Sequence, residues 1–110
     1  MTTRHVFVIW VNSLFHESAR LLLRHPDIIW VGDAKDFTTA HEAIMKFQPD
    51  TILFEKTKGG IPNGMLEILE SENWDVRIIG LSLDNNEMCL YHREHQTIVK
   101  AGDLLQYVLG

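Results

Sequence analysis

Five short apolar runs recur along the chain, and each ends at residues that favour turns. The runs are rich in β-branched and aromatic side chains, and most are continuously apolar instead of alternating with polar residues. Continuous apolar strands are typical of a sheet that is covered on both faces. We therefore predict five strands, at residues 6–11, 28–31, 51–54, 76–81 and 97–99.

Segments with helical spacing lie between these runs. The first predicted helix has an apolar stripe over residues 15–23, with Asn12 and Ser13 as candidate caps. The second has its stripe over residues 37–47, and Thr39 with Glu42 forms a candidate capping box near its start. A third stripe begins at Met65, and a short last helix covers residues 103–108.

Residues 83–96 interrupt this alternation, because they carry no clear helical stripe. The apolar residues 88–91 and 97–99 flank a polar stretch at residues 92–95. This pattern favours a hairpin over a helix.

Strands that alternate with helices predict right-handed βαβ units and a doubly wound parallel sheet. We expect one domain over residues 1–110, since a chain of 110 residues is of ordinary single-domain length. In such sheets, ligands bind outside the carboxyl ends of the strands. The candidate functional residues are therefore those that directly follow each predicted strand.

Composition narrows the classes of function. The net charge of −5 and the lack of a Lys/Arg run argue against direct nucleic-acid binding. No apolar stretch approaches the roughly 20 residues of a membrane helix. The N-terminal apolar run is too short for a signal peptide, and a single cysteine fits a reducing compartment, so we expect a cytoplasmic protein.

Four segments, in this order and spacing, resemble response-regulator receiver domains of the CheY-like superfamily, especially those attached to helix-turn-helix DNA-binding domains. The segments cover residues 14–23, 26–34, 48–55 and 75–82, and the resemblance extends over nearly the whole chain except residues 83–96. It implies an α/β, flavodoxin-like fold with a five-stranded parallel sheet in the order 2-1-3-4-5. The fourth helix of that fold is here eroded or replaced by a hairpin.

The resemblance also implies where a phosphorylation site would lie. Working receivers place two acidic residues after the first strand, an aspartate after the third, a Ser or Thr after the fourth and a lysine after the fifth. Oxygen ligands there hold Mg²⁺, which neutralises the incoming phosphoryl group. The matching positions in this sequence are Trp10, Val11, Glu55, Ser82 and Lys100, with Thr97 at the position of the family's aromatic switch residue.

These substitutions remove the oxygen ligands, since an indole and a valine replace the acidic pair. The sequence thus resembles a degenerate receiver, or pseudo-receiver, with no metal, no cofactor and no catalytic residue. Glu55, Ser82 and Lys100 either form a charge pair that imitates a phosphorylated aspartate or keep a leftover salt bridge of little energetic value. Trp10 either plugs the former pocket or recognises a partner.

Three other features have a functional and a plain structural interpretation. Cys89 with His92 and His95 suggests zinc or nucleophilic chemistry, but a solvated turn explains the same residues. The segment Lys56-Thr57-Lys58-Gly59-Gly60 either attracts an anion or is a receiver-type loop with two solvated lysines, because it lacks the Gly-x-x-x-x-Gly-Lys-Ser/Thr pattern of a phosphate-binding loop. The residues Met88, Leu90 and Tyr91 form either an exposed, self-associating strand edge or ordinary packing under a loop.

The leading hypothesis is a phosphorylation-independent pseudo-receiver that acts by protein–protein contact in bacterial or archaeal signalling or transcription regulation, and not as an enzyme. Its partner is a signalling protein or an attached output domain. A homodimer through the last two strands and the final helix, or through the edge near Tyr91, is compatible with the sequence. The alternatives are a small-ligand sensor for a nucleotide or anion near Lys56, Lys58 and Lys100, and residual phosphoacceptor activity at Glu55.

Overall fold

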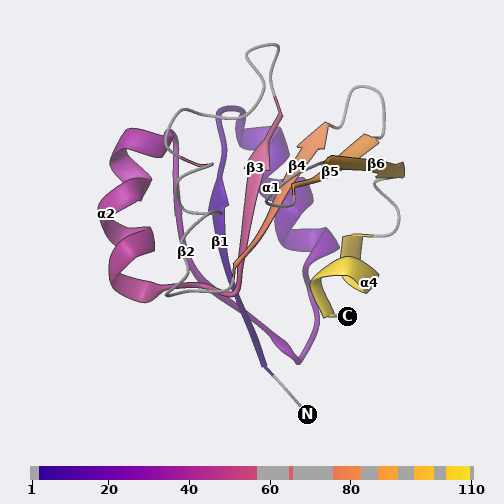
Figure 1. Ribbon diagram of the computed structural model, residues 1–110, viewed down its shortest axis with the longest axis horizontal. Helices are drawn as coiled ribbons and strands as arrows, with labels where there is room; N and C mark the ends of the chain where they lie inside the picture. The colour runs from indigo at the N-terminus through magenta and orange to yellow at the C-terminus, as the bar shows by residue number, and fades with distance from the viewer. Residues whose placement is uncertain are drawn as a thin grey trace.

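A mixed six-stranded sheet forms the centre of the described part of the chain, with helices on both of its faces (Figure 1). The computed structural model describes residues 3–56, 65, 76–82, 87–91, 96–100 and 104–109. The strands are β1 (Arg4–Ile9), β2 (Ile28–Ala34), β3 (Thr51–Glu55), β4 (Arg77–Ser82), β5 (Glu87–Tyr91) and β6 (Gln96–Lys100).

The strand order is β2-β1-β3-β4-β5-β6. Parallel pairing joins β2 to β1, β1 to β3 and β3 to β4. By contrast, β5 is antiparallel to both of its neighbours, β4 and β6. The sheet therefore has a parallel part of four strands and an antiparallel part at one side.

The predicted α/β class, the parallel order of the first four strands and the hairpin are confirmed, but the five-strand parallel sheet is wrong. The run at residues 97–99 is β6, and β5 lies between it and β4. The connections explain the difference. Only four residues separate β4 from β5 and β5 from β6, and a connection that short joins antiparallel neighbours, whereas parallel neighbours need a crossover of a dozen or more residues.

Capping side chains set the start of α1 and α2, the longer of the described helices. Asn12 is the N-cap of α1 (Ser13–Leu22), and its side chain accepts a hydrogen bond from Leu14 N at 2.9 Å. Asp36 is the N-cap of α2 (Phe37–Phe47), and its Oδ1 accepts from Thr39 N at 2.6 Å. The predicted capping box at Thr39 and Glu42 is therefore wrong, because Thr39 lies inside the first turn and Asp36 caps it.

The ends of the helices also follow local chemistry. Gln48 ends α2 in a left-handed conformation, with φ of 45°, and Pro49 follows it. At the chain's other end, α4 (Leu104–Leu109) is held by Arg77, whose Nη1 donates to Tyr107 O at 2.6 Å and to Val108 O at 3.3 Å. Within the described residues, no helix is both long and apolar enough to cross a membrane.

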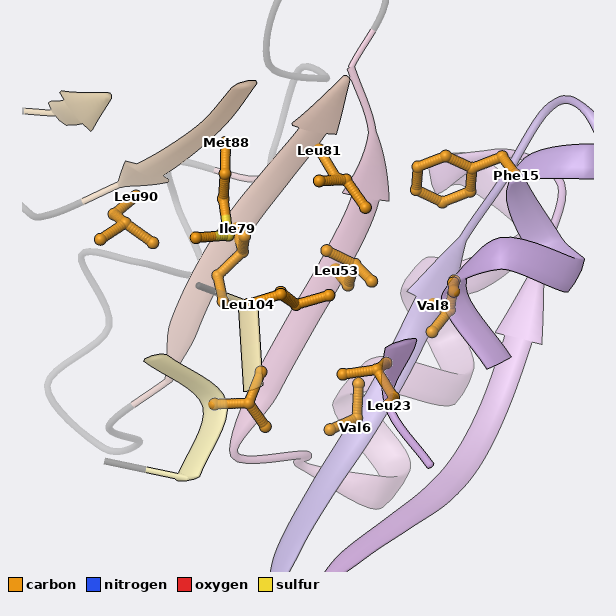
Figure 2. Close-up of a cluster of buried hydrophobic side chains, with 12 residues drawn as sticks. Val6, Val8, Phe15, Leu23, Leu53, Ile79, Leu81, Met88, Leu90 and Leu104 are labelled. Atoms are coloured by element: carbon orange, nitrogen blue, oxygen red, sulfur yellow. The ribbon is translucent and has the colours of Figure 1, made fainter. Parts of the chain in front are cut away.

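A hydrophobic layer fills each face of the sheet. On one face, Phe15 of α1, its C-cap Leu23 and Leu104 of α4 pack against strand residues, and this layer continues onto β5 through Met88 and Leu90 (Figure 2). On the other face, Ala40 and Ile44 of α2, together with Met65, pack against residues of the central strands that include Phe7, Ile52 and Phe54. The β5 strand is thus part of the core.

Candidate functional site at the strand ends

The Glu55 carboxylate is fixed at the carboxyl end of β3. Its Oε1 accepts hydrogen bonds from Val11 N and Asn12 N, both at 2.9 Å. The ends of β1 and β3 meet because these strands are parallel neighbours. The two amides also lie at the N-terminal end of α1, where the helix dipole favours a negative charge. Glu55 therefore ties the end of β3 to the loop that follows β1.

Trp10, at the end of β1, belongs to a polar and aromatic cluster centred on Asp33. Trp10 Nε1 donates to Asp33 Oδ1 at 3.1 Å, and Trp30 Nε1 donates to Asp33 Oδ2 at 3.1 Å. His16 Nε2 lies 3.4 Å from Asp33 Oδ2. Burial acts to raise the pKa of Asp33, but the hydrogen bonds from Trp10, Trp30 and His16 outweigh it and lower that pKa below its usual value.

The rings of this Asp33 cluster contact one another in tilted and edge-on arrangements, and two cations lie over the indoles. The His16 ring lies between the two indoles, with centroids 4.8 Å from Trp10 and 5.5 Å from Trp30. Lys35 Nζ lies 5.1 Å from the ring centroid of Trp10, and the Arg20 guanidinium lies 4.9 Å from that of Trp30. The half-buried Trp10 side chain is thus engaged with β2 and α1. Whether it also plugs the former pocket stays a prediction.

Sequence reasoning missed the Asp33 cluster, because its members are far apart along the chain. A usable signal was present in the two tryptophans, Trp10 and Trp30, which belong to neighbouring strands of the expected sheet. The carboxylate that both indoles need lies three residues after Trp30.

Lys100 is not a neighbour of Glu55. The ends of β3 and β4 are adjacent, and Ser82 comes one residue after Leu81, the register partner of Glu55. Lys100 ends β6, with β4 and β5 between it and β3. Three strand spacings amount to about 14 Å. The ion pair expected between Glu55 and Lys100 is therefore not formed, and Lys100 is the register partner of Glu87 on β5.

The predicted edge at Met88, Leu90 and Tyr91 is wrong, and ordinary packing explains these residues. Met88 is fully buried and Leu90 is 9% exposed, and β6 covers the side of β5 that was expected to be open. The Tyr91 ring lies 5.7 Å from that of Phe54. Thr97, the position of the expected switch residue, is the register partner of Leu90 inside the hairpin.

The cation that reaches β5 is Lys56, which directly follows Glu55. Its Nζ donates to Sγ of the buried Cys89 at 3.1 Å. This hydrogen bond raises the pKa of Lys56, and burial raises the pKa of Tyr91. The other residues of the zinc and anion hypotheses, His92, His95 and Lys58, lie outside the described residues.

In the described part of the chain, the ends of β1 and β3 offer few oxygen ligands. After β1 come an indole and a valine, and the Glu55 carboxylate at the end of β3 already accepts two amide hydrogen bonds. Among the residues that the structure describes, no group of three or more His, Cys, Asp or Glu side chains is placed to hold a metal ion. Mg²⁺ prefers an octahedral set of oxygens with one or two carboxylates.

Neither a protein-family model nor a curated protein matches this chain. A search of solved structures found similarity to the signal receiver domain of the response regulator NarL from Mycobacterium tuberculosis. The two share 24% sequence identity over 74% of this chain and 68% of the other, with a TM-score of 0.61. At this level of identity the likeness concerns the fold, which is similar to that of a CheY-like receiver domain.

Proposed function

We propose that this chain is a pseudo-receiver, a response-regulator-like signalling module that works by protein–protein contact and without phosphorylation. The observation that carries the proposal is the position of Glu55. A carboxylate that accepts hydrogen bonds from Val11 N and Asn12 N has part of its lone-pair capacity committed to the protein itself. It is a structural tie between the end of β3 and the loop that follows β1.

Two further features support the proposal. Trp10 and Val11 bring no side-chain oxygen to the end of β1, so a divalent cation beside Glu55 would lack the carboxylates that a receiver supplies. Lys100, the expected partner of a phosphoryl oxygen, lies beyond two intervening strands. The side chains that would neutralise charge during phosphoryl transfer are therefore either missing or distant.

The proposal extends to partners and location. A receiver fold without phosphoryl chemistry still presents a rigid surface that a signalling protein or an output domain can bind, as in transcription regulation. We propose such a protein partner in the cytoplasm, with no cofactor, no direct nucleic-acid contact and no catalytic turnover.

Incubation with acetyl phosphate and Mg²⁺ tests the proposal. Intact-mass measurement should show no added phosphoryl group, while a receiver with a full acidic site, treated in parallel, should gain one. A phosphoryl adduct that disappears in Glu55→Gln would contradict the proposal and establish residual phosphoacceptor activity. The substitution Glu42→Gln, at an exposed site on α2, is the matched control.

A ligand-sensor function makes a different prediction for the same protein. If the crevice at the strand ends bound a nucleotide or another anion, that ligand would raise the melting temperature. We expect no rise with a panel of nucleotides and inorganic phosphate. A rise that Lys56→Met abolishes would favour the sensor.

A further inference from the structure

Among the strands that the structure describes, none pairs with the outer side of β6, which is therefore an edge of the described sheet. Arg77 N donates to Asp50 O, and Lys56 N donates to Leu81 O, both at 2.9 Å. The odd-numbered residues of β4 therefore direct their backbone groups toward β3, and the even-numbered residues direct theirs toward β5. Continued across the antiparallel ladder, this alternation makes Met88–Val99 and Leu90–Thr97 the hydrogen-bonded pairs of β5 and β6.

It follows that Gln96, Ile98 and Lys100 direct their backbone N–H and C=O groups away from β5. The sheet order ends at β6, so no strand of the described chain pairs with these groups. Ile98 is also 56% exposed, although it belongs to a β-branched run. Figure 1 shows β6 on the outside of the sheet, at the side opposite to α2. An open edge with an apolar side chain favours pairing with another strand.

The opposite edge strand, β2, is protected in a way that β6 is not. The register between β1 and β2 shifts by one residue at Val31, which makes an irregularity typical of guarded edges. Asp33 lies near the end of β2, and its charged carboxylate accepts hydrogen bonds from two indoles. Both devices discourage the pairing of edges between molecules. The register between β5 and β6 has no such shift, and the charged residue of β6 is Lys100 at its end.

We propose that β6 pairs with β6 of a second copy of this chain, antiparallel and about a two-fold axis at Ile98. In this register Ile98 faces Ile98 of the partner subunit, and Gln96 faces Lys100 of the partner subunit. The outward N–H groups of each β6 strand then donate hydrogen bonds to the outward C=O groups of the other. These hydrogen bonds join the two sheets into one continuous sheet. This inference does not rest on the proposed lack of phosphorylation.

The sequence of β6 is what selects a second copy as the occupant. Pairing about Ile98 places the cation of each strand opposite a neutral residue of the other, so like charges do not meet. The two exposed isoleucines become direct cross-strand neighbours on one face, and aliphatic pairs of this kind stabilise sheets. A closed two-fold contact of this type also ends assembly at the dimer.

A cysteine at the two-fold axis tests both the surface and the register. In a hydrogen-bonded antiparallel pair, opposed Cα atoms lie about 5.5 Å apart, which suits a disulfide. Under mild oxidation, Ile98→Cys should give a covalent dimer on a non-reducing gel. Ile29→Cys, at a 47% exposed site on β2, is the matched control. The unmodified chain controls for the buried Cys89.

Sedimentation over a range of concentrations measures the same contact without a cross-link. The wild-type chain should dimerise, and Ile98→Lys should raise its dissociation constant about tenfold or more, because it exchanges two buried side chains for two like charges. Ile29→Lys should leave the constant unchanged. A wild-type chain that stays monomeric throughout, or cross-linking of both cysteine variants to the same extent, would overturn the proposal.

Discussion

At the scale of single residues, the carboxylates of Glu55 and Asp33 accept hydrogen bonds from different kinds of donor. Glu55 accepts from backbone amides and joins β3 to the start of α1. Asp33 accepts from side chains and joins β1, β2 and α1 through two indoles and an imidazole.

The sequence placed Trp10, Val11 and Glu55 correctly at the strand ends, because strand periodicity locates such positions. It did not give their partners, since hydrogen bonds between residues 20 to 45 positions apart follow from the sheet register.

The Asp33 cluster gives a prediction about acid stability. The folded-state pKa of Asp33 lies below the usual 3.8, so its hydrogen bonds stabilise the fold above that pH, and this contribution is lost as the pH falls through the folded-state value. Asp33→Asn should therefore lower the free energy of unfolding at pH 7 by about 1 kcal/mol. The gap between wild type and variant should close at more acidic pH.

Urea titrations followed by tryptophan fluorescence, at several pH values from neutral to strongly acidic, measure this gap. The exposed Glu42→Gln substitution, which also removes one negative charge, controls for net charge. A gap of constant size at every pH would show that the Asp33 carboxylate does not act through its charged form.

At the scale of elements, the position of β5 depends on close packing against β3 and β4. A Cβ atom on Gly80 would lie 2.7 Å from Cζ of Phe54, and that ring is almost completely buried. Phe54 in turn contacts Tyr91 of β5. The missing side chain at residue 80 thus makes room for the ring that links these three strands.

Gly80→Ala should consequently destabilise the fold by about 1–3 kcal/mol, because the Phe54 ring must shift within a packed core. Phe54→Leu removes the clashing atom. The double variant should therefore lose less stability than the sum of the two single variants, as measured by urea unfolding. Additive losses would show that the ring is free to move away.

The C-terminal helix gives a second prediction at this scale. Arg77→Met removes the cation that donates to the carbonyls of Tyr107 and Val108 but keeps much of the side-chain volume. The free energy of unfolding should fall by about 1–2 kcal/mol. Hydrogen exchange should increase within residues 104–109, and the exposed Arg24→Met should leave it unchanged. Equal exchange in both variants would mean that α4 is held by its apolar contacts alone.

At the scale of the whole molecule, hydrophobic periodicity predicted where the strands and helices lie in the sequence better than it predicted which strands pair with each other. The predicted strands at residues 6–11, 28–31, 51–54 and 76–81 overlap β1 to β4 with different ends, and the hairpin was expected from residues 88–99. The predicted strand order was wrong after β4, where β5 and β6 lie. An apolar run such as residues 97–99 shows that a strand exists but not which strand it pairs with. Chain connection decides that, and here the hairpin keeps β5 between β4 and β6.

The place of β5 between β4 and β6 limits what the exchange of side chains could produce at the strand ends. Suppose that acids were returned to positions 10 and 11 and an aspartate to position 55. The carboxylates would then lie together at the ends of β1 and β3. Lys100, however, would still end β6, which is separated from β3 by two strands. Bringing the lysine next to the carboxylates would also require a change in the order of the strands. Under the proposed function, the absence of phosphoryl transfer follows from the order of the strands as well as from the side chains at positions 10, 11 and 55.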